Sequence, residues 1–117
     1  MKIRNFRDLE VWQLGKKVVI EVYKATKEFP QDEVYGLVSQ MRRAAVSIPS
    51  NIAEGFNRYH NKDYRKYLFI SLGSCAELET QIEIACDLEY MMIVDRNILL
   101  ENLDHESRML RNLIKKL

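Results

Sequence analysis

The side chains in this sequence that could carry out acid–base or metal chemistry are two histidines, two cysteines and 17 acidic residues. A dimetal site in a helical bundle typically uses Glu-x-x-His, but the residue three positions before His60 and before His105 is an asparagine in both cases. The sequence also lacks GxSxG, HExxH and the glycine pattern of a phosphate-binding loop. We therefore expect no catalytic residues, no metal site and no cofactor.

The two cysteines do not form a redox or metal motif. Cys75 and Cys86 have no histidine within four positions, and the sequence contains no CxxC. On one helix they would share a face but lie about 16 Å apart, which is too far for a disulfide. We expect both to be small apolar fillers of a core.

A group of polar residues interrupts segments that are otherwise rich in small and apolar residues: Arg42, Arg43, Asn51, Glu54, Glu77 and Glu79. If the chain turns back at His60, residues at equal distances from the turn lie side by side, which places Arg43 opposite Glu77. We expect these two to form a salt bridge, because burying either charge alone would be costly. The group is interpreted as structural or as part of an interface. One alternative is that the six residues line a site between helices. A more remote alternative is an enzyme that uses Asn51, Glu54 and Glu77, which would need a deep pocket around these side chains.

Helices are the elements that must position these side chains. Apolar residues recur every three to four positions in four segments, which predict helices over residues 11–29, 37–56, 64–88 and 95–117. We expect Asn61 and Asp95 to cap the third and fourth helices, and Glu106 is the only break in the apolar stripe of the fourth. The short connections require antiparallel neighbours. The predicted fold is all-α, a single up-down-up-down four-helix bundle domain over residues 1–117.

Pro49 lies inside the second predicted helix and removes one backbone donor there. The apolar spacing continues across it from Ala45 to Ile52, which favours a kinked helix that resumes after the proline. Ser47 and Ser50 are expected to satisfy backbone groups freed at the kink. The alternative is a full break, with Ser47 capping a new helix.

The chain carries 18 basic and 17 acidic side chains, a net charge of +1, but the predicted fold separates them. Antiparallel helices bring the start of the first helix, the turn between the second and third, and the end of the fourth together. This basic end would hold eleven Lys and Arg against five acids, a net charge of +6. The opposite, acidic end would hold eight acids and three bases, a net charge of −5.

The basic end is a candidate surface for binding phosphate groups. Seven of its residues are predicted to contact nucleic acid: Arg58, Lys62, Arg65, Lys66, Arg111, Lys115 and Lys116. Tyr59, Tyr64 and Tyr67 lie beside Arg58 and Arg65, and their rings would allow stacking on unpaired bases. The alternative is a solvated surface whose charges only favour solubility and helix ends.

The predicted helices carry more apolar residues than one core needs. The additional ones are Ile20, Tyr23, Phe69, Ile70, Ile84, Ile98, Leu100, Met109 and Ile114. They predict that copies of the chain pack side by side. The alternative is an ordinary scatter of exposed apolar residues.

Length and composition agree with such a fold. With 117 residues, of which 47% are hydrophobic and 30% charged, the chain can build one core and is not a disordered protein. Its most apolar uncharged stretch, residues 67–76, is far too short to span a membrane. The N-terminus has no apolar core of the signal-peptide type. We expect a soluble, cytoplasmic protein with no membrane partner.

Residues 6–12, 40–55 and 72–80, which include Asn-Ile-Ala-Glu-Gly and Gly-Ser-x-x-Glu-Leu-Glu, resemble a known bacterial family. Its members are four-helix bundle proteins first noticed as open reading frames in intervening sequences of 23S ribosomal RNA genes. The resemblance covers nearly the whole chain. It implies a homopentameric ring, and a relationship to the accessory protein of diversity-generating retroelements, a basic barrel that binds nucleic acid and reverse transcriptase.

These observations predict a non-enzymatic, homo-oligomeric helical bundle that binds RNA or other nucleic acid through its basic end. In a ring of parallel copies the basic ends would share one rim, and a weak patch would gain strength through avidity. The alternative function is a protein-interaction scaffold that recruits a protein partner.

Overall fold

Four α-helices make up most of the computed structural model, which describes residues 3–117. They are α1 (Glu10–Thr26), α2 (Leu37–Phe56), α3 (Asn61–Asp87) and α4 (Ile93–Lys115). Two short 3-10 helices, η1 (Phe6–Asp8) and η2 (Gln31–Glu33), precede α1 and α2. No strand occurs within residues 3–117. The prediction of an all-α chain with four helices is confirmed.

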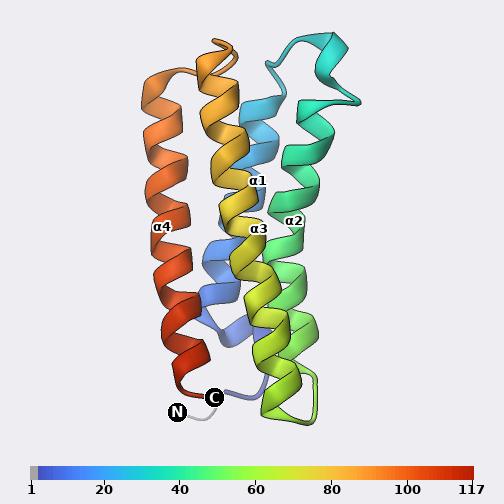
Figure 1. Cartoon of the computed structure of the whole chain (residues 1–117), viewed down its shortest axis with the longest axis vertical. Coiled ribbons are helices and arrows are strands. Elements are labelled where there is room, and N and C mark those ends of the chain that lie inside the picture. Colours follow the sequence, from blue (N-terminus) through green and yellow to red (C-terminus); the bar gives the residue numbers. More distant parts are fainter. Residues whose placement is uncertain (1–2) are drawn as a thin grey trace.

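Successive helices run in opposite directions along one long axis (Figure 1). α1 packs on α2, α2 on α3 and α3 on α4, and α4 returns to pack on α1, so the helices enclose one core. The molecule measures 43 × 25 × 19 Å. Residues 3–9, the end of α4 and the α2–α3 turn share one end, and the α1–α2 and α3–α4 connections share the other (Figure 1).

The core is built from one apolar stripe of each helix. Its largest fully buried apolar side chains are Val18, Val22, Met41, Ile48, Ile52, Leu68, Leu78, Ile82, Leu103 and Leu110. Burial of an aliphatic side chain of this size stabilises a fold by roughly 1.5–3 kcal/mol. Packing of the four apolar stripes therefore fixes the helices, and with them their ends, relative to one another. Within the described part of the chain, no helix is long and apolar enough to cross a membrane.

α2 continues without interruption through Pro49, so the alternative of two separate helices is wrong. The kink at this position stays a prediction. Ser47 does not act as expected, because its hydroxyl lies 2.8 Å from the Ser74 hydroxyl of α3 and accepts a hydrogen bond of 2.9 Å from Asn51 Nδ2. Ser50 is exposed. The serine at position 47 therefore ties α2 to α3 beside the proline.

Four helix ends differ from the prediction by two or three residues, and one of them is the end of α4, at Lys115 instead of Leu117. α1 ends at Thr26, three residues before Phe29. Asn61 lies inside α3 and does not cap it. Asp95 lies in the first turn of α4, where its carboxylate still faces the positive end of the helix dipole. Apolar spacing fixes the buried face of a helix but not its first and last hydrogen bonds, which explains the shifts of two or three residues.

Candidate nucleic-acid interface

Three separate segments meet at the end of the bundle that holds the α2–α3 turn (Figure 1). They are the residues before α1, the α2–α3 turn and the last turns of α4. Their described basic residues are Arg4, Arg7, Arg58, Lys62, Arg65, Lys66, Arg108, Arg111, Lys115 and Lys116. All of them are exposed except Arg65, which is half-buried. Lys2, which the prediction also placed at this basic end, lies outside the described residues.

Arg58 follows α2 and is held by side chains from both helices of the turn. Its Nη2 donates to Glu54 Oε1 and to Tyr67 Oη, each at 2.7 Å. The guanidinium also lies over the Tyr67 ring, 4.8 Å from the ring centroid. The ion pair with Glu54 is exposed, and such pairs contribute only about 0.3–0.5 kcal/mol. Arg58 is therefore oriented by its neighbours and partly neutralised.

The other cations of the basic end are less constrained. Arg65 Nη1 donates to the main-chain oxygen of Leu117, which ties α3 to the end of the chain. Arg108 pairs with Asp104 at 3.2 Å. Within residues 3–117, no acid lies within ion-pair distance of Lys62, Lys66, Arg111, Lys115 or Lys116. These five charges face water and remain available to an anionic ligand.

Of the three tyrosines predicted to stack on bases, only one is free to do so. Tyr64 is half-buried and packs edge-on against Phe56, with ring centroids 6.1 Å apart. One face of Tyr67 carries the Arg58 guanidinium. Tyr59, at the α2–α3 turn, is 94% exposed, and the His60 ring lies edge-on to it with ring centroids 4.9 Å apart. The stacking hypothesis therefore narrows to Tyr59.

One acid that the prediction counted at the basic end is not on its surface. Glu106 lies in the core with 0% exposure, and neither carboxyl oxygen has a hydrogen-bond partner. Gly15 of α1 makes room for it, since a Cβ at that position would lie 2.8 Å from Glu106 Oε2. Burial raises the pKa of this carboxyl to about 8, so it is mainly uncharged at pH 7. The exposed acids that remain at this end are Asp8, Glu10, Glu54 and Asp63.

The predicted salt bridge between Arg43 and Glu77 is wrong. Both residues are exposed, and no ion pair joins them. Counting residues from the turn gives the height of a side chain along the bundle, but each residue also rotates by about 100° around the helix axis. Glu54 likewise pairs with Arg58 of its own segment and not across to α3.

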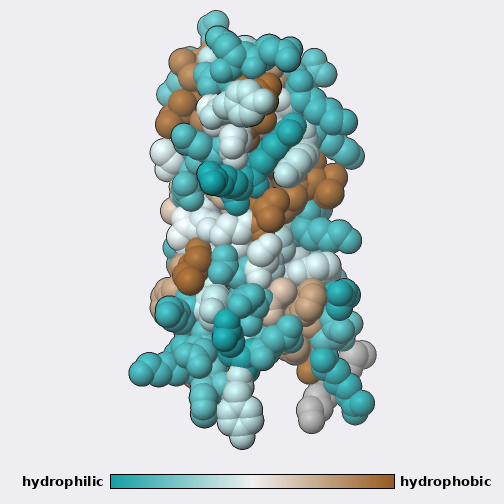
Figure 2. Space-filling model, turned by 90° about the vertical axis from the view of Figure 1, so that its right-hand side faces the viewer, coloured by the Kyte–Doolittle hydropathy of each residue, from teal (hydrophilic) through white to brown (hydrophobic). Residues whose placement is uncertain are grey.

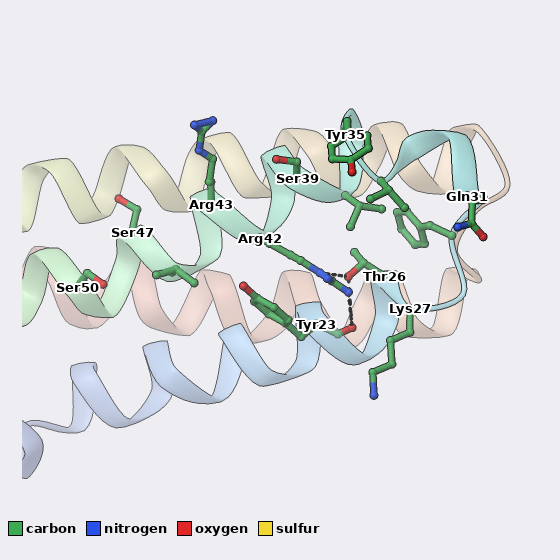
Figure 3. A pocket seen from close by; sticks show the side chains of 14 residues that line it. Tyr23, Thr26, Lys27, Gln31, Tyr35, Ser39, Arg42, Arg43, Ser47 and Ser50 are labelled. Carbon is green, nitrogen blue, oxygen red and sulfur yellow. Dashed lines mark hydrogen bonds between the residues drawn. The ribbon is translucent and has the colours of Figure 1, made fainter.

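Arg42 contributes to a different place, an open groove of about 920 Å³ between α1 and α2. Its Nε donates to Thr26 Oγ1 at 2.9 Å and its Nη2 to the Tyr23 carbonyl at 3.3 Å. The guanidinium lies 4.4 Å from the centroid of the Tyr23 ring. Figure 3 shows Arg42 directed toward α1 and Arg43 directed away from it. The two adjacent arginines therefore have different surroundings.

The six polar residues singled out in the sequence do not form one site. No hydrogen bond or ion pair joins any two of them within the described chain. Asn51 bonds to Ser47, and Glu77 is exposed. Glu79 is half-buried, and its pKa is raised by burial and by the nearby Asp104 of α4. The six residues therefore have separate surroundings in the described structure.

Comparison with known proteins agrees with this fold. The sequence pattern of the family described as 23S rRNA-intervening sequence protein matches residues 7–112. A crystal structure of a protein of unknown function from the S23 ribosomal protein family of Bacteroides thetaiotaomicron VPI-5482 matches with a TM-score of 0.83. The two are 20% identical, and the match covers 90% of this chain and 95% of that one, which is a likeness of fold. No curated protein sequence matches the chain. Because the family pattern spans all four helices, the protein belongs to the 23S rRNA-intervening sequence protein family.

Proposed function

We propose that this protein is a non-enzymatic, homo-oligomeric bundle that binds RNA or other nucleic acid through its basic end. The observation that carries the proposal is the meeting of three basic segments at one end, where five cations have no acidic partner among residues 3–117. Phosphate contacts with such cations dominate affinity for nucleic acid. On the side drawn in Figure 2, hydrophilic residues predominate at this lower end, while hydrophobic patches lie higher up.

Lys62 and Lys66 provide the sharpest test, because they are exposed and make no ion pair that their removal would break. Binding of a fluorescent RNA with an unpaired loop would be measured by anisotropy over a range of salt concentrations. Replacing both lysines with alanine should weaken binding at least tenfold at low salt. It should also reduce the slope of log K against log salt by about 1.4, the value for two contacts to a single strand.

The matched control removes two exposed lysines from elsewhere on the bundle. Lys17 and Lys24 lie on α1, outside the three basic segments. The double alanine variant at these positions changes the net charge by the same amount and should bind RNA with nearly the wild-type salt slope. Equal losses in both variants would mean that net charge alone attracts RNA. No binding by the wild type at low salt would refute the proposed function.

Self-association is supported by the exposed face of α3. This α3 face comprises Phe69, Ile70, Gly73, Glu77 and Ile84, all of them exposed. A Cβ added at Gly73 would have no heavy atom within 4 Å. Glycine inside a helix costs about 1 kcal/mol relative to alanine, and packing within this chain gives no reason for it. Close approach by another helix is such a reason.

The groove between α1 and α2 suits this face in charge and polarity. The charged residues that line it, Lys27, Arg42 and Arg43, are all basic, whereas the α3 face carries Glu77. Part of the groove wall is apolar, as the exposed side chains of α3 are. A second copy whose α3 face lies in this groove would make a contact between two different surfaces. Contacts of this kind generate rings when the rotation closes.

Sedimentation velocity across protein concentrations tests this assembly. Gly73→Ala should shift the oligomer toward smaller species, because the added methyl group holds the two helices apart. The same substitution should leave an isolated chain equally or more stable, by up to about 1 kcal/mol. Asn112→Ala, at an exposed position of α4, is the control for helix propensity and should sediment as the wild type does. A wild type that stays monomeric at every concentration would contradict the assembly.

A further inference from the structure

The end of the molecule opposite the basic end carries an unusual exposed apolar cluster. We call residues 87–95, which comprise the last residue of α3, the connection and the first three residues of α4, the α3–α4 tip. Three consecutive apolar side chains of the tip are largely exposed: Met92 by 73%, Ile93 by 62% and Val94 by 64%. Leu88 is also exposed. Packing within this chain does not use these side chains, and contiguous exposed apolar residues are typical of interaction sites.

The tip is anchored from below and does not depend on its exposed residues for its conformation. Met91 is buried in the core, and the Tyr90 ring packs against Phe29 with ring centroids 5.5 Å apart. Tyr90 Oη donates to Glu33 Oε2 at 2.9 Å, which ties the tip to the α1–α2 connection. The backbone turns at Glu89, whose φ of 64° lies in the left-handed region. The neighbouring apolar residues are therefore presented outward from a fixed base.

Two hollows lie beside the exposed cluster, with volumes of about 490 and 770 Å³. They share Tyr90, Met91 and Met92, so they adjoin each other across these residues. Hollows of this size have room for several side chains of a partner, and methionine adapts its shape to apolar groups. The apolar tip is therefore not a smooth surface but has two recesses that anchor residues of a partner would fill.

The charged residues that line the two hollows are mainly acidic. Their acidic residues are Glu21, Glu28, Asp87, Glu89 and Asp95, against only two basic residues, Lys24 and Arg96. Arg96 is already engaged, since its Nη1 donates to Glu83 Oε1 at 3.4 Å. A ligand for this surface therefore needs apolar groups for the recesses and positive charges for the rim.

We propose that the α3–α4 tip docks a basic amphipathic helix from a protein partner. The apolar face of that helix fills the two hollows, and its Lys and Arg side chains meet the acidic rim. This role goes beyond nucleic-acid binding and does not depend on it. Two other occupants fit less well. Two tips facing each other would bring like charges together, and an anionic membrane surface would repel the acidic rim.

A synthetic peptide serves as the probe. It has about 14 residues, only leucine and lysine, with leucine every three to four positions so that it folds as an amphipathic helix on binding. Fluorescence anisotropy should show saturable binding of this peptide and at least tenfold weaker binding of the same peptide with glutamate in place of lysine. Hydrogen exchange of the complex should show new protection at residues 87–98 and not in the α1–α2 groove.

Ile93→Ser should weaken binding of the lysine peptide at least tenfold without lowering the helix content of the protein. The matched control is Ile3→Ser, at an isoleucine that is 39% exposed and precedes η1 at the opposite end of the bundle, and the affinity of this variant for the lysine peptide should be unchanged. Equal affinity for the two peptides, or protection elsewhere in the molecule, would overturn the proposal. Dimerisation without peptide that Ile93→Ser abolishes would mean that the tip serves self-association instead. Binding to anionic vesicles that Ile93→Ser abolishes would mean that the tip binds membranes instead.

Discussion

Replacing Glu106 with glutamine should stabilise the fold, and the gain should grow with pH. The carboxyl is fully buried without a hydrogen-bond partner, and burial raises its pKa from 4.5 to about 8. The native chain therefore binds this proton more tightly than the unfolded chain does, so stability falls as the pH rises. The fall begins near pH 4.5, where the unfolded chain loses the proton. It levels off above about pH 8, where the native chain loses it as well.

The magnitude follows from these two pKa values. One pKa unit corresponds to about 1.4 kcal/mol. Compared with a side chain that does not titrate, Glu106 lowers the free energy of unfolding by about 1 kcal/mol at pH 5, about 3 kcal/mol at pH 7 and about 5 kcal/mol at pH 9. Glutamine has nearly the same size, and the penalty for its unpaired amide does not depend on pH. The difference in stability between variant and wild type should therefore widen by about 4 kcal/mol from pH 5 to pH 9.

Urea unfolding at pH 5, 7 and 9 measures this difference, with far-ultraviolet circular dichroism and Trp12 fluorescence as independent probes. Protein concentration is held constant, because self-association would add to the apparent stability. Glu101→Gln is the control, since Glu101 is exposed on the same helix and its removal should change the pH profile little. Parallel profiles for Glu106→Gln and wild type would refute the reasoning, because they would mean that the core does not hold this proton.

Three further outcomes follow from the packing. Gly15→Ala should destabilise the fold by roughly 1–3 kcal/mol in urea unfolding, because its Cβ would lie 2.8 Å from the buried carboxyl oxygen; unchanged stability would mean that the core can give way there. Gly55→Ala should lower the urea midpoint by a similar free energy, since its Cβ would lie 2.8 Å from the Cβ of Tyr67 on α3, and a rise in the midpoint would contradict this close approach. Iodoacetamide at pH 8 should label Cys86 well before Cys75, whose burial raises its thiol pKa to about 12, and peptide mass spectrometry would show the order.

Much of the fold could be predicted from apolar spacing alone. The stripe from Leu37 to Phe56 matches α2 at both ends, since it begins after a glycine and stops near the next turn. The predicted start of α4 is wrong by two residues. Aspartate is a common N-cap residue, which favoured Asp95, but the helix begins after Met92, whose side chain makes no capping hydrogen bond. When a helix begins without a capping side chain, no residue type in the sequence indicates its first residue.

The candidate site was harder to predict, because it depends on the direction in which each side chain points and not only on the position of each residue along the bundle axis. Tyr59, Tyr64 and Tyr67 have similar sequence surroundings, but packing leaves only the first of them free. Glu106 was visible as a break in an apolar stripe, yet its burial depends on Gly15 of another helix. A polar residue that interrupts the apolar stripe of one helix, opposite a glycine in the stripe of a facing helix, is a signal that could have identified the buried carboxyl. The sequence does not say which two stripes face each other at that height.

The way in which copies associate decides whether the two ends of the bundle act together. A contact between the α3 face and the α1–α2 groove joins two different surfaces, so neighbouring copies are related by a rotation. If that rotation axis runs along the bundle, every basic end lies on one rim and every α3–α4 tip on the other. Each rim would then bind its partner at several points, with effective concentrations set by the fixed spacing of the copies. Gly73→Ala should in that case weaken the binding of RNA and of a chain carrying several linked copies of the lysine peptide, although Gly73 lies in neither binding surface. Weakening of only one of them would mean that the copies do not share a common direction.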